Sequence, residues 1–157
     1  MAKKRQKKYL FLIAVVLIAA VTLSGAFILA LTSTGKTRLD AEYYGAAGET
    51  PIDTEEYEQL LKQQKSFIVA SAATACSSDI LDFIDRFSET EKISYYYINW
   101  SNFTNSSTGD AIQYPPTVFI VSKGKIVAYL DSDAANDVEK YNNYDDFLSW
   151  MRENIDF

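Results

Sequence analysis

The chain has 157 residues, 48% hydrophobic and 23% charged, enough for one folded domain with an appendage but not for two full domains. It contains no histidine and one cysteine, Cys76, which excludes histidine-based catalysis, internal disulfides, CxxC pairs and thiolate zinc clusters. The net charge is −6, yet five basic residues crowd the first eight positions and every acidic residue lies beyond position 31. The remainder is therefore strongly acidic, which argues against a nucleic-acid partner.

Residues 1–8 form a basic head, and residues 9–31 follow as an apolar stretch without a charge. As a helix this stretch would be roughly 34 Å long, enough to cross a hydrocarbon core of about 30 Å. A cleaved signal peptide is the alternative, but its apolar core is shorter, about 7–15 residues. The excess of basic residues before the stretch predicts a single-pass anchor in the plasma membrane, with the N-terminus cytoplasmic and the rest extracytoplasmic.

Residues 32–51 contain three glycines and a proline and have no sustained apolar period. This composition predicts a flexible linker, so that the folded domain would comprise residues 52–157.

The folded domain alternates between helix and strand signals. Asp53 supplies an N-cap for a first helix, and the aromatic and β-branched run at 93–100 is typical of a strand. The further predicted elements are a buried strand at 66–72, a helix at 77–87, a hairpin of strands 117–121 and 125–130 that turns at Gly124, and a helix at 144–155. This order predicts an α/β fold with a parallel β–α–β unit and an antiparallel hairpin at one edge of a mixed sheet.

Two segments carry a resemblance to a known family. Residues 111–127 (AIQYPPTVFIVSKGKIV) resemble the cis-proline loop of the thioredoxin fold, in which a Pro-Thr pair opens a strand that turns at a glycine into the next strand. Residues 67–79 (FIVASAATACSSD) resemble the family's strand, active-site loop and helix, with Cys76 at the position of its nucleophilic cysteine. The resemblance covers residues 52–157 and implies a thioredoxin-like mixed sheet flanked by helices.

The resemblance also assigns roles to residues. Cys76 would lie at a helix N-terminus, where unpaired N–H groups and the helix dipole favour the thiolate. Pro116 would form the cis peptide bond beside this thiol and, with Pro115 and Thr117, would hold an extended peptide next to it. Pro115 has no N–H, so we expect this loop to hold a peptide more weakly than its relatives do.

Three positions depart from the family's pattern. Asp79 replaces the second cysteine, so a two-cysteine cycle is impossible; Ala75 replaces the usual tryptophan, and Ala70 stands where the family has a buried acid. The helix dipole stabilises a thiolate by about 0.3–1 kcal/mol. Two like charges about 6 Å apart, at a dielectric of about 20, repel by roughly 2.8 kcal/mol, so Asp79 could outweigh the dipole. Asp79 also has a structural interpretation, as a first-turn acid that caps the helix.

These departures predict an accessory or protein-binding module that has lost dithiol chemistry. Two alternatives remain open, a monothiol thiol–disulfide oxidoreductase and a redox sensor, because Cys76 is equally consistent with an inert buried residue and with a reactive thiol. The expected partners are the membrane and a secreted or membrane protein, or its thiol. No cofactor is expected, and no metal, because the acidic loop at 131–137 lacks the glycine and the terminal glutamate of a calcium loop.

Overall fold

A computed structural model of the chain describes residues 35–73 and 79–157. The basic head, the predicted span at 9–31 and Cys76 lie outside the described residues. Within the described ranges, no helix has the length and apolar character needed to cross a bilayer. The helices and strands are η1 (Ala41–Tyr43), β1 (Gly48–Ile52), α2 (Thr54–Lys62), β2 (Phe67–Ala72), α3 (Asp79–Glu91), β3 (Ser94–Asn99), α4 (Trp100–Thr104), η2 (Gly109–Ala111), β4 (Thr117–Ser122), β5 (Lys125–Tyr129), α5 (Val138–Asn142) and α6 (Tyr144–Asn154).

The five strands form one mixed sheet in the order β1-β3-β2-β4-β5. Strands β1, β3 and β2 are parallel, whereas β4 is antiparallel to both β2 and β5. The predicted parallel β–α–β unit and the predicted hairpin are both confirmed. The hairpin turns at Lys123 and Gly124, which both have positive φ, and a Cβ at Gly124 would collide with the carbonyl oxygen of Leu61. Glycine is therefore required at this turn.

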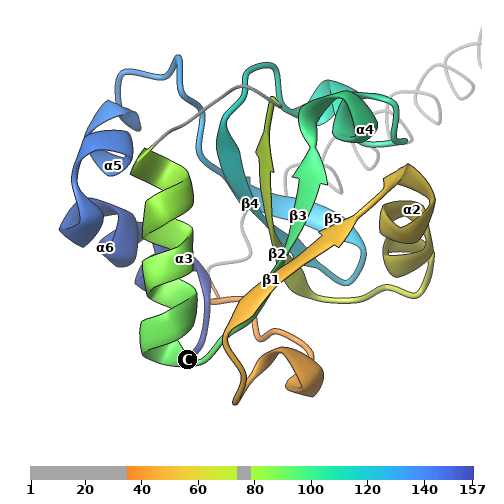
Figure 1. Cartoon of the computed structure of the whole chain (residues 1–157), viewed down its shortest axis with the longest axis horizontal. Coiled ribbons are helices and arrows are strands. Elements are labelled where there is room, and N and C mark those ends of the chain that lie inside the picture. The colour runs from red at the N-terminus through yellow and green to blue at the C-terminus, as the bar shows by residue number, and fades with distance from the viewer. Residues whose placement is uncertain (1–34, 74–78) are drawn as a thin grey trace, which may run out of the picture. The chain divides into compact units, whose positions relative to one another are not determined.

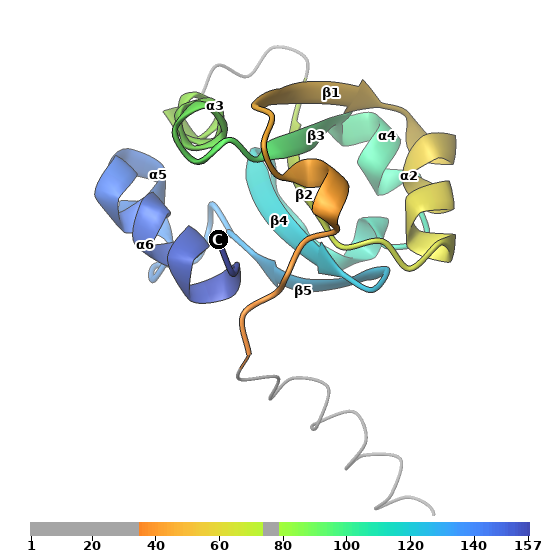
Figure 2. The same cartoon turned by 90° about the horizontal axis from the view of Figure 1, so that it is seen from below.

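Helices cover both faces of the sheet (Figures 1 and 2). One face is covered by α3, α5 and α6, and the other by α2 and α4. Because β2 and β4 lie in the middle of the sheet and are covered on both faces, they consist of continuous apolar runs and not of alternating residues. The side chains of β2 are all buried, and so are those of β4 except at its last residue.

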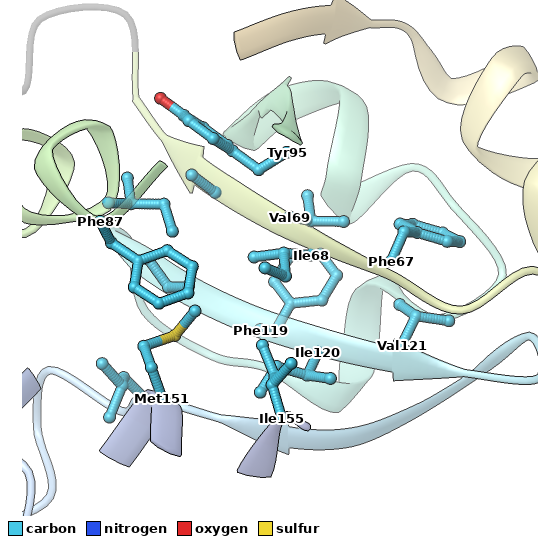
Figure 3. Close-up of a cluster of buried hydrophobic side chains, with 14 of the residues drawn as sticks. Phe67, Ile68, Val69, Phe87, Tyr95, Phe119, Ile120, Val121, Met151 and Ile155 are labelled. Atoms are coloured by element: carbon cyan, nitrogen blue, oxygen red, sulfur yellow. The ribbon is translucent and has the colours of Figure 1, made fainter. Parts of the chain in front are cut away.

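The core lies where these two strands meet the helices (Figure 3). Phe119 of β4 is fully buried, with its ring centroid 5.0 Å from that of Phe103 and 6.2 Å from that of Tyr57. The core also contains Phe87 of α3 and Met151 of α6, both fully buried. The helices on both sides are therefore held to the sheet through large apolar side chains.

The predicted linker was wrong from residue 36 onward. Leu39 and Tyr43 are buried in the core, at 3% and 4% exposure, and β1 pairs with β3 along its whole length. The compact unit accordingly spans Lys36–Phe157. Sequence patterns missed this segment because β1 is an edge strand whose side chains are exposed or half-buried, so neither an apolar run nor an alternation marks it. Its proline removes an N–H at a sheet edge, as is common for exposed edges.

The predicted N-cap of the first helix, Asp53, is confirmed as the N-cap of α2. The carboxylate of Asp53 accepts the N–H of Glu56 at 2.9 Å, and the Glu56 carboxylate accepts the N–H of Asp53 at 3.0 Å, which forms a capping box. The short helices α4 and α5 had no predicted counterpart, because five-residue helices are too short for a helical apolar stripe to be recognised.

The hydrogen bond between Glu58 of α2 and Ser107, in the segment after α4, is expected to make the stability of the domain depend on pH. The Glu58 carboxylate accepts the backbone N–H of Ser107, and this hydrogen bond lowers the pKa of Glu58. A lowered folded-state pKa means that the stabilisation is present above the unfolded value of about 4.3 and is lost as the pH falls through the folded value.

We therefore expect Glu58→Gln to lower the free energy of unfolding by about 0.5–1 kcal/mol at pH 7, a figure that allows for solvent screening. The difference from the wild type should disappear in acid, below the lowered pKa. Urea unfolding of the full chain at both pH values, followed by tryptophan fluorescence, measures this, since both tryptophans lie in the domain. Glu89→Gln, on the exposed surface of α3, is the control, and an equal loss in both variants would contradict the assignment.

Candidate functional site

The candidate site is the Pro loop, which we define as Tyr114–Thr117. It leads into β4, and its last residue, Thr117, is the first residue of that strand and pairs with Ser71 near the end of β2. The peptide bond between Pro115 and Pro116 is cis, as the resemblance implied. Both prolines are half-buried, and the Tyr114 side chain is 47% exposed. The loop therefore presents one aromatic and two proline side chains at the end of the sheet where β2 finishes.

Thr117 was predicted to bind a peptide, but its side chain is used inside the fold. It is fully buried, and its hydroxyl donates to the carbonyl oxygen of Leu130 at 2.7 Å. This bond joins the start of β4 to the end of β5.

Tyr141 of α5 is a component of the loop that sequence reasoning missed. Its hydroxyl lies 2.9 Å from the carbonyl oxygen of Pro116 and 2.9 Å from that of Leu130. Burial, followed by the charge of Asp137, raises the pKa of Tyr141, so the phenol stays protonated and remains a donor. No local motif could have revealed this contact, because Tyr141 is 25 residues away from Pro116 in the sequence.

Cys76, the candidate nucleophile, lies in the segment 74–78, outside the described residues, and its proximity to Pro116 stays a prediction. The described chain on either side ends at Ala73 and resumes at Asp79, the first residue of α3, and both residues are exposed. The antiparallel pairing of β2 with β4 brings Ala72, the last residue of β2, to the same end of the sheet as Pro116. The Tyr97 hydroxyl donates to the Ala72 carbonyl oxygen at 3.3 Å.

Ala70 occupies the position that the resemblance assigns to a buried acid. It is fully buried in β2, between Tyr97 of β3 and Val118 of β4. A methyl group at this position can neither accept nor supply a proton, so the site lacks the acid–base group that the family's chemistry uses there.

The charges of the domain are unevenly distributed along the strand direction. The segments next to the Pro-loop end carry seven acidic residues and one lysine: Asp79, Asp82, Asp110, Asp131, Asp133, Asp137, Glu139 and Lys140. At the opposite end, where β2 and β3 begin and β4 turns into β5, five lysines are mixed with four acidic residues, and one lysine pairs with two of these acids: Lys62, Lys65, Lys92, Lys123 and Lys125, with Asp40, Glu42, Glu89 and Glu91. A cationic segment that approaches the domain is therefore attracted toward the Pro-loop end.

The acidic loop after β5 is held by its own hydrogen bonds. The Asp137 carboxylate accepts the N–H of Asp131 at 3.0 Å and pairs with Lys140 at 2.6 Å, and the Asp131 carboxylate accepts the N–H of Asp133 at 2.9 Å. Within residues 35–73 and 79–157, no three His, Cys, Asp or Glu side chains come together as metal ligands.

Two surface hollows of the described chain lie away from the Pro loop. One, of about 540 Å³, is lined by residues that include Arg38, Tyr44 and Phe157 near the C-terminus. The other, of about 280 Å³, lies between β1 and α2 and is lined by residues that include Pro51 and Tyr96. Neither hollow contains a residue of the Pro loop, so the candidate site is distinct from both.

No protein-family model and no curated protein sequence matches the chain. Solved structures do match. The thioredoxin of Malassezia sympodialis has a TM-score of 0.52 and 12% identity, over 68% of this chain and 90% of that one. Spinach chloroplast thioredoxin f, in its short form, has a TM-score of 0.50 and 13% identity, over 68% and 93%. A thioredoxin of Nicotiana alata has a TM-score of 0.50 and 13% identity, over 71% and 96%. The domain therefore has a thioredoxin-like fold, a mixed sheet flanked by helices, as the sequence predicted.

Proposed function

We propose that the chain is a single-pass membrane protein whose thioredoxin-like domain lies outside the cytoplasm and binds a partner protein through the Pro loop, without dithiol chemistry. The anchor and its orientation rest on the uncharged stretch at 9–31 and on the basic residues before it. The absence of dithiol chemistry rests on the single cysteine of the chain and on Asp79 at the position of the second one.

The observation that carries this proposal is the contrast between an intact Pro loop and missing reaction groups. The loop is held to the domain by hydrogen bonds from the hydroxyls of Thr117 and Tyr141, whereas the side chain of Tyr114 is exposed to solvent. The buried position at which a thioredoxin-like enzyme would need an acid is occupied by Ala70. A loop that keeps its form while the acid–base group is lost supports binding more than turnover.

The charge of the Pro-loop end favours a partner with a basic segment. Seven acidic residues and one lysine lie in the segments next to this end, so a lysine- or arginine-rich chain is attracted and a polyanion is repelled. Since the domain is proposed to lie outside the cytoplasm, the partner would be a secreted protein or the exposed part of a membrane protein.

Photocrosslinking in intact cells tests the proposal. We expect p-benzoylphenylalanine in place of Tyr114, in the full chain, to give a discrete adduct with a protein that carries a basic segment. The same substitution at Val127, which is 50% exposed on β5, should not give it. In membrane vesicles the yield at position 114 should fall when NaCl is raised from about 50 mM to about 500 mM, because salt screens exposed charges.

The same experiment separates binding from thiol chemistry. An adduct at position 114 that persists in Cys76→Ser supports a binding module. An adduct that requires Cys76 would instead favour the monothiol exchange enzyme or the redox sensor, and equal adducts at positions 114 and 127 would argue against a specific Pro-loop surface.

A further inference from the structure

The phenol of Tyr141 joins two carbonyl groups that belong to different strands. One is Pro116 O, immediately before β4, and the other is Leu130 O, immediately after β5, each 2.9 Å from the hydroxyl oxygen. A phenol has one proton, so the two carbonyls share it in a bifurcated hydrogen bond. The side chain thus connects the Pro loop to α5, an element that follows it by more than twenty residues.

The two carbonyls do not depend equally on Tyr141. Leu130 O also accepts the hydroxyl of Thr117 at 2.7 Å, so it keeps a donor when the phenol is removed. The Pro116 carbonyl oxygen accepts the Tyr141 hydroxyl, and no second donor to it is found among residues 35–73 and 79–157. Removing the Tyr141 hydroxyl therefore leaves mainly the Pro116 carbonyl, in the middle of the Pro loop, without its hydrogen bond.

The helix that carries Tyr141 is itself held to the end of β5. Asp137, just before α5, pairs with Lys140 at 2.6 Å and accepts the N–H of Asp131 at 3.0 Å. The Lys140 ammonium also donates to the carbonyl oxygen of Asn136 at 2.7 Å. The phenol therefore reaches Pro116 from a segment with defined contacts of its own, which is the condition for positioning another group precisely in space.

We propose that Tyr141 is the positioning residue of the Pro loop, because its hydroxyl holds the Pro116 carbonyl in the arrangement that receives the partner. This inference rests on the proposed function of the loop, and it adds that α5, through Tyr141, determines the position of the loop. The Tyr141 hydroxyl donates to two carbonyl oxygens of the fold, so the role proposed for this group is to hold the loop.

Tyr141→Phe is the decisive variant, since it keeps the ring and removes the hydroxyl. We expect photocrosslinking at position 114 of the full chain to fall about fivefold, the change that corresponds to one neutral hydrogen bond. The matched control is Tyr44→Phe. The Tyr44 hydroxyl also joins two backbone groups, donating to Asp156 O at 2.9 Å and accepting the N–H of Leu39 at 3.1 Å, away from the Pro loop. Both variants should lower the melting temperature, but only Tyr141→Phe should lower capture.

A spectroscopic readout identifies the bond itself. The chain has three prolines, so selective ¹³C labelling of proline carbonyls gives three signals. In Tyr141→Phe the Pro116 signal should move toward that of a carbonyl without a hydrogen bond, while the signal of Pro51, in β1, stays in place. In Tyr44→Phe all three signals should stay.

The outcomes are distinct. Capture by Tyr141→Phe at the wild-type level, or an equal loss in Tyr44→Phe, would overturn the positioning role. If the wild type itself captured nothing at position 114, the proposed function would fail instead. Should Tyr141→Phe not fold, Lys140→Gln decides, because it removes the contacts of Lys140 with Asp137 and Asn136 that hold α5 and keeps the phenol in the chain. Loss of this positive charge would by itself raise the capture of a basic segment. Reduced capture therefore supports the inference, and capture at or above the wild-type level overturns it.

Discussion

Removing residues 36–51 is expected to unfold the domain. A fragment of residues 36–157 should fold, whereas one of residues 52–157 should not. The shorter fragment loses all of β1 except Ile52. It also loses the buried side chains of Leu39 and Tyr43, and the Tyr43 ring packs against that of Tyr96 with 5.7 Å between ring centroids. Full burial of one such side chain contributes about 1.5–3 kcal/mol. The whole domain is expected to have only about 5–15 kcal/mol of stability, so losing two of them together with a strand removes most of it.

Tryptophan fluorescence and near-UV circular dichroism measure this difference. Trp150 is buried and Trp100 half-buried, so both report the packing of the domain. We expect native spectra and a cooperative melting transition from residues 36–157 and neither from residues 52–157. A cooperative transition in the shorter fragment would restore the boundary that the sequence alone suggested and would contradict the role assigned to β1.

Phe119→Ala is expected to lower the free energy of unfolding by about 3–5 kcal/mol, the range for a fully buried phenylalanine. The ring fills the space between β4 and the helices on one face of the sheet, with Phe103 at 5.0 Å and Tyr57 at 6.2 Å between ring centroids. Both helices on that face, α2 and α4, would lose a contact at once. Urea unfolding of the full chain, followed by fluorescence, gives the value.

The matched control is Tyr129→Ala. Tyr129 is the cross-strand partner of Phe119 on β5, but it is 40% exposed. We expect this substitution to cost at most about 1 kcal/mol, the upper value for one cross-strand pair. Similar losses at both positions would mean that the core does not lie where β4 meets α2 and α4.

The central strands and the hairpin could be predicted because burial on both faces and a tight turn each leave a signal in a few consecutive residues. Strands β2 and β4 lie between two layers of helices, so burial on both faces forces unbroken apolar runs that the sequence displays. Gly124 marks the hairpin because positive φ and the nearby carbonyl oxygen of Leu61 leave no room for a side chain. The Pro loop could be located by its motif, since two prolines followed by a strand form a short, contiguous pattern.

The elements that could not be predicted depend on contacts between distant segments. Strand β1 is an exposed edge that contains glycine and proline, so its composition is that of a linker, and its pairing with β3 is visible only in the folded chain. Tyr141 lies in a five-residue helix, and nothing near it in the sequence indicates that its hydroxyl reaches Pro116. Hydrogen bonds of this kind are determined by tertiary structure and leave no periodic signal.

For function, the contacts that hold the Pro loop to the domain are more extensive than the backbone groups that it offers to a partner. Pro115 and Pro116 supply no N–H, so a partner can pair with few backbone groups of the loop. On the side that faces the domain, the hydroxyls of Thr117 and Tyr141 hold the loop by donating to the carbonyl oxygens of Leu130 and Pro116. A loop of this type is suited to recognition by shape, by the exposed ring of Tyr114 and by charge, more than by strand pairing.

The central claim is that this thioredoxin-like domain binds and does not exchange disulfides. The most direct test is a disulfide-reduction assay with the purified full chain in detergent and a small external thiol as reductant, comparing the wild type with Cys76→Ser. We predict that both proteins stay at the rate of the external thiol alone. Robust turnover by the wild type that Cys76→Ser abolishes would contradict the account and make Cys76 the nucleophile of a monothiol enzyme.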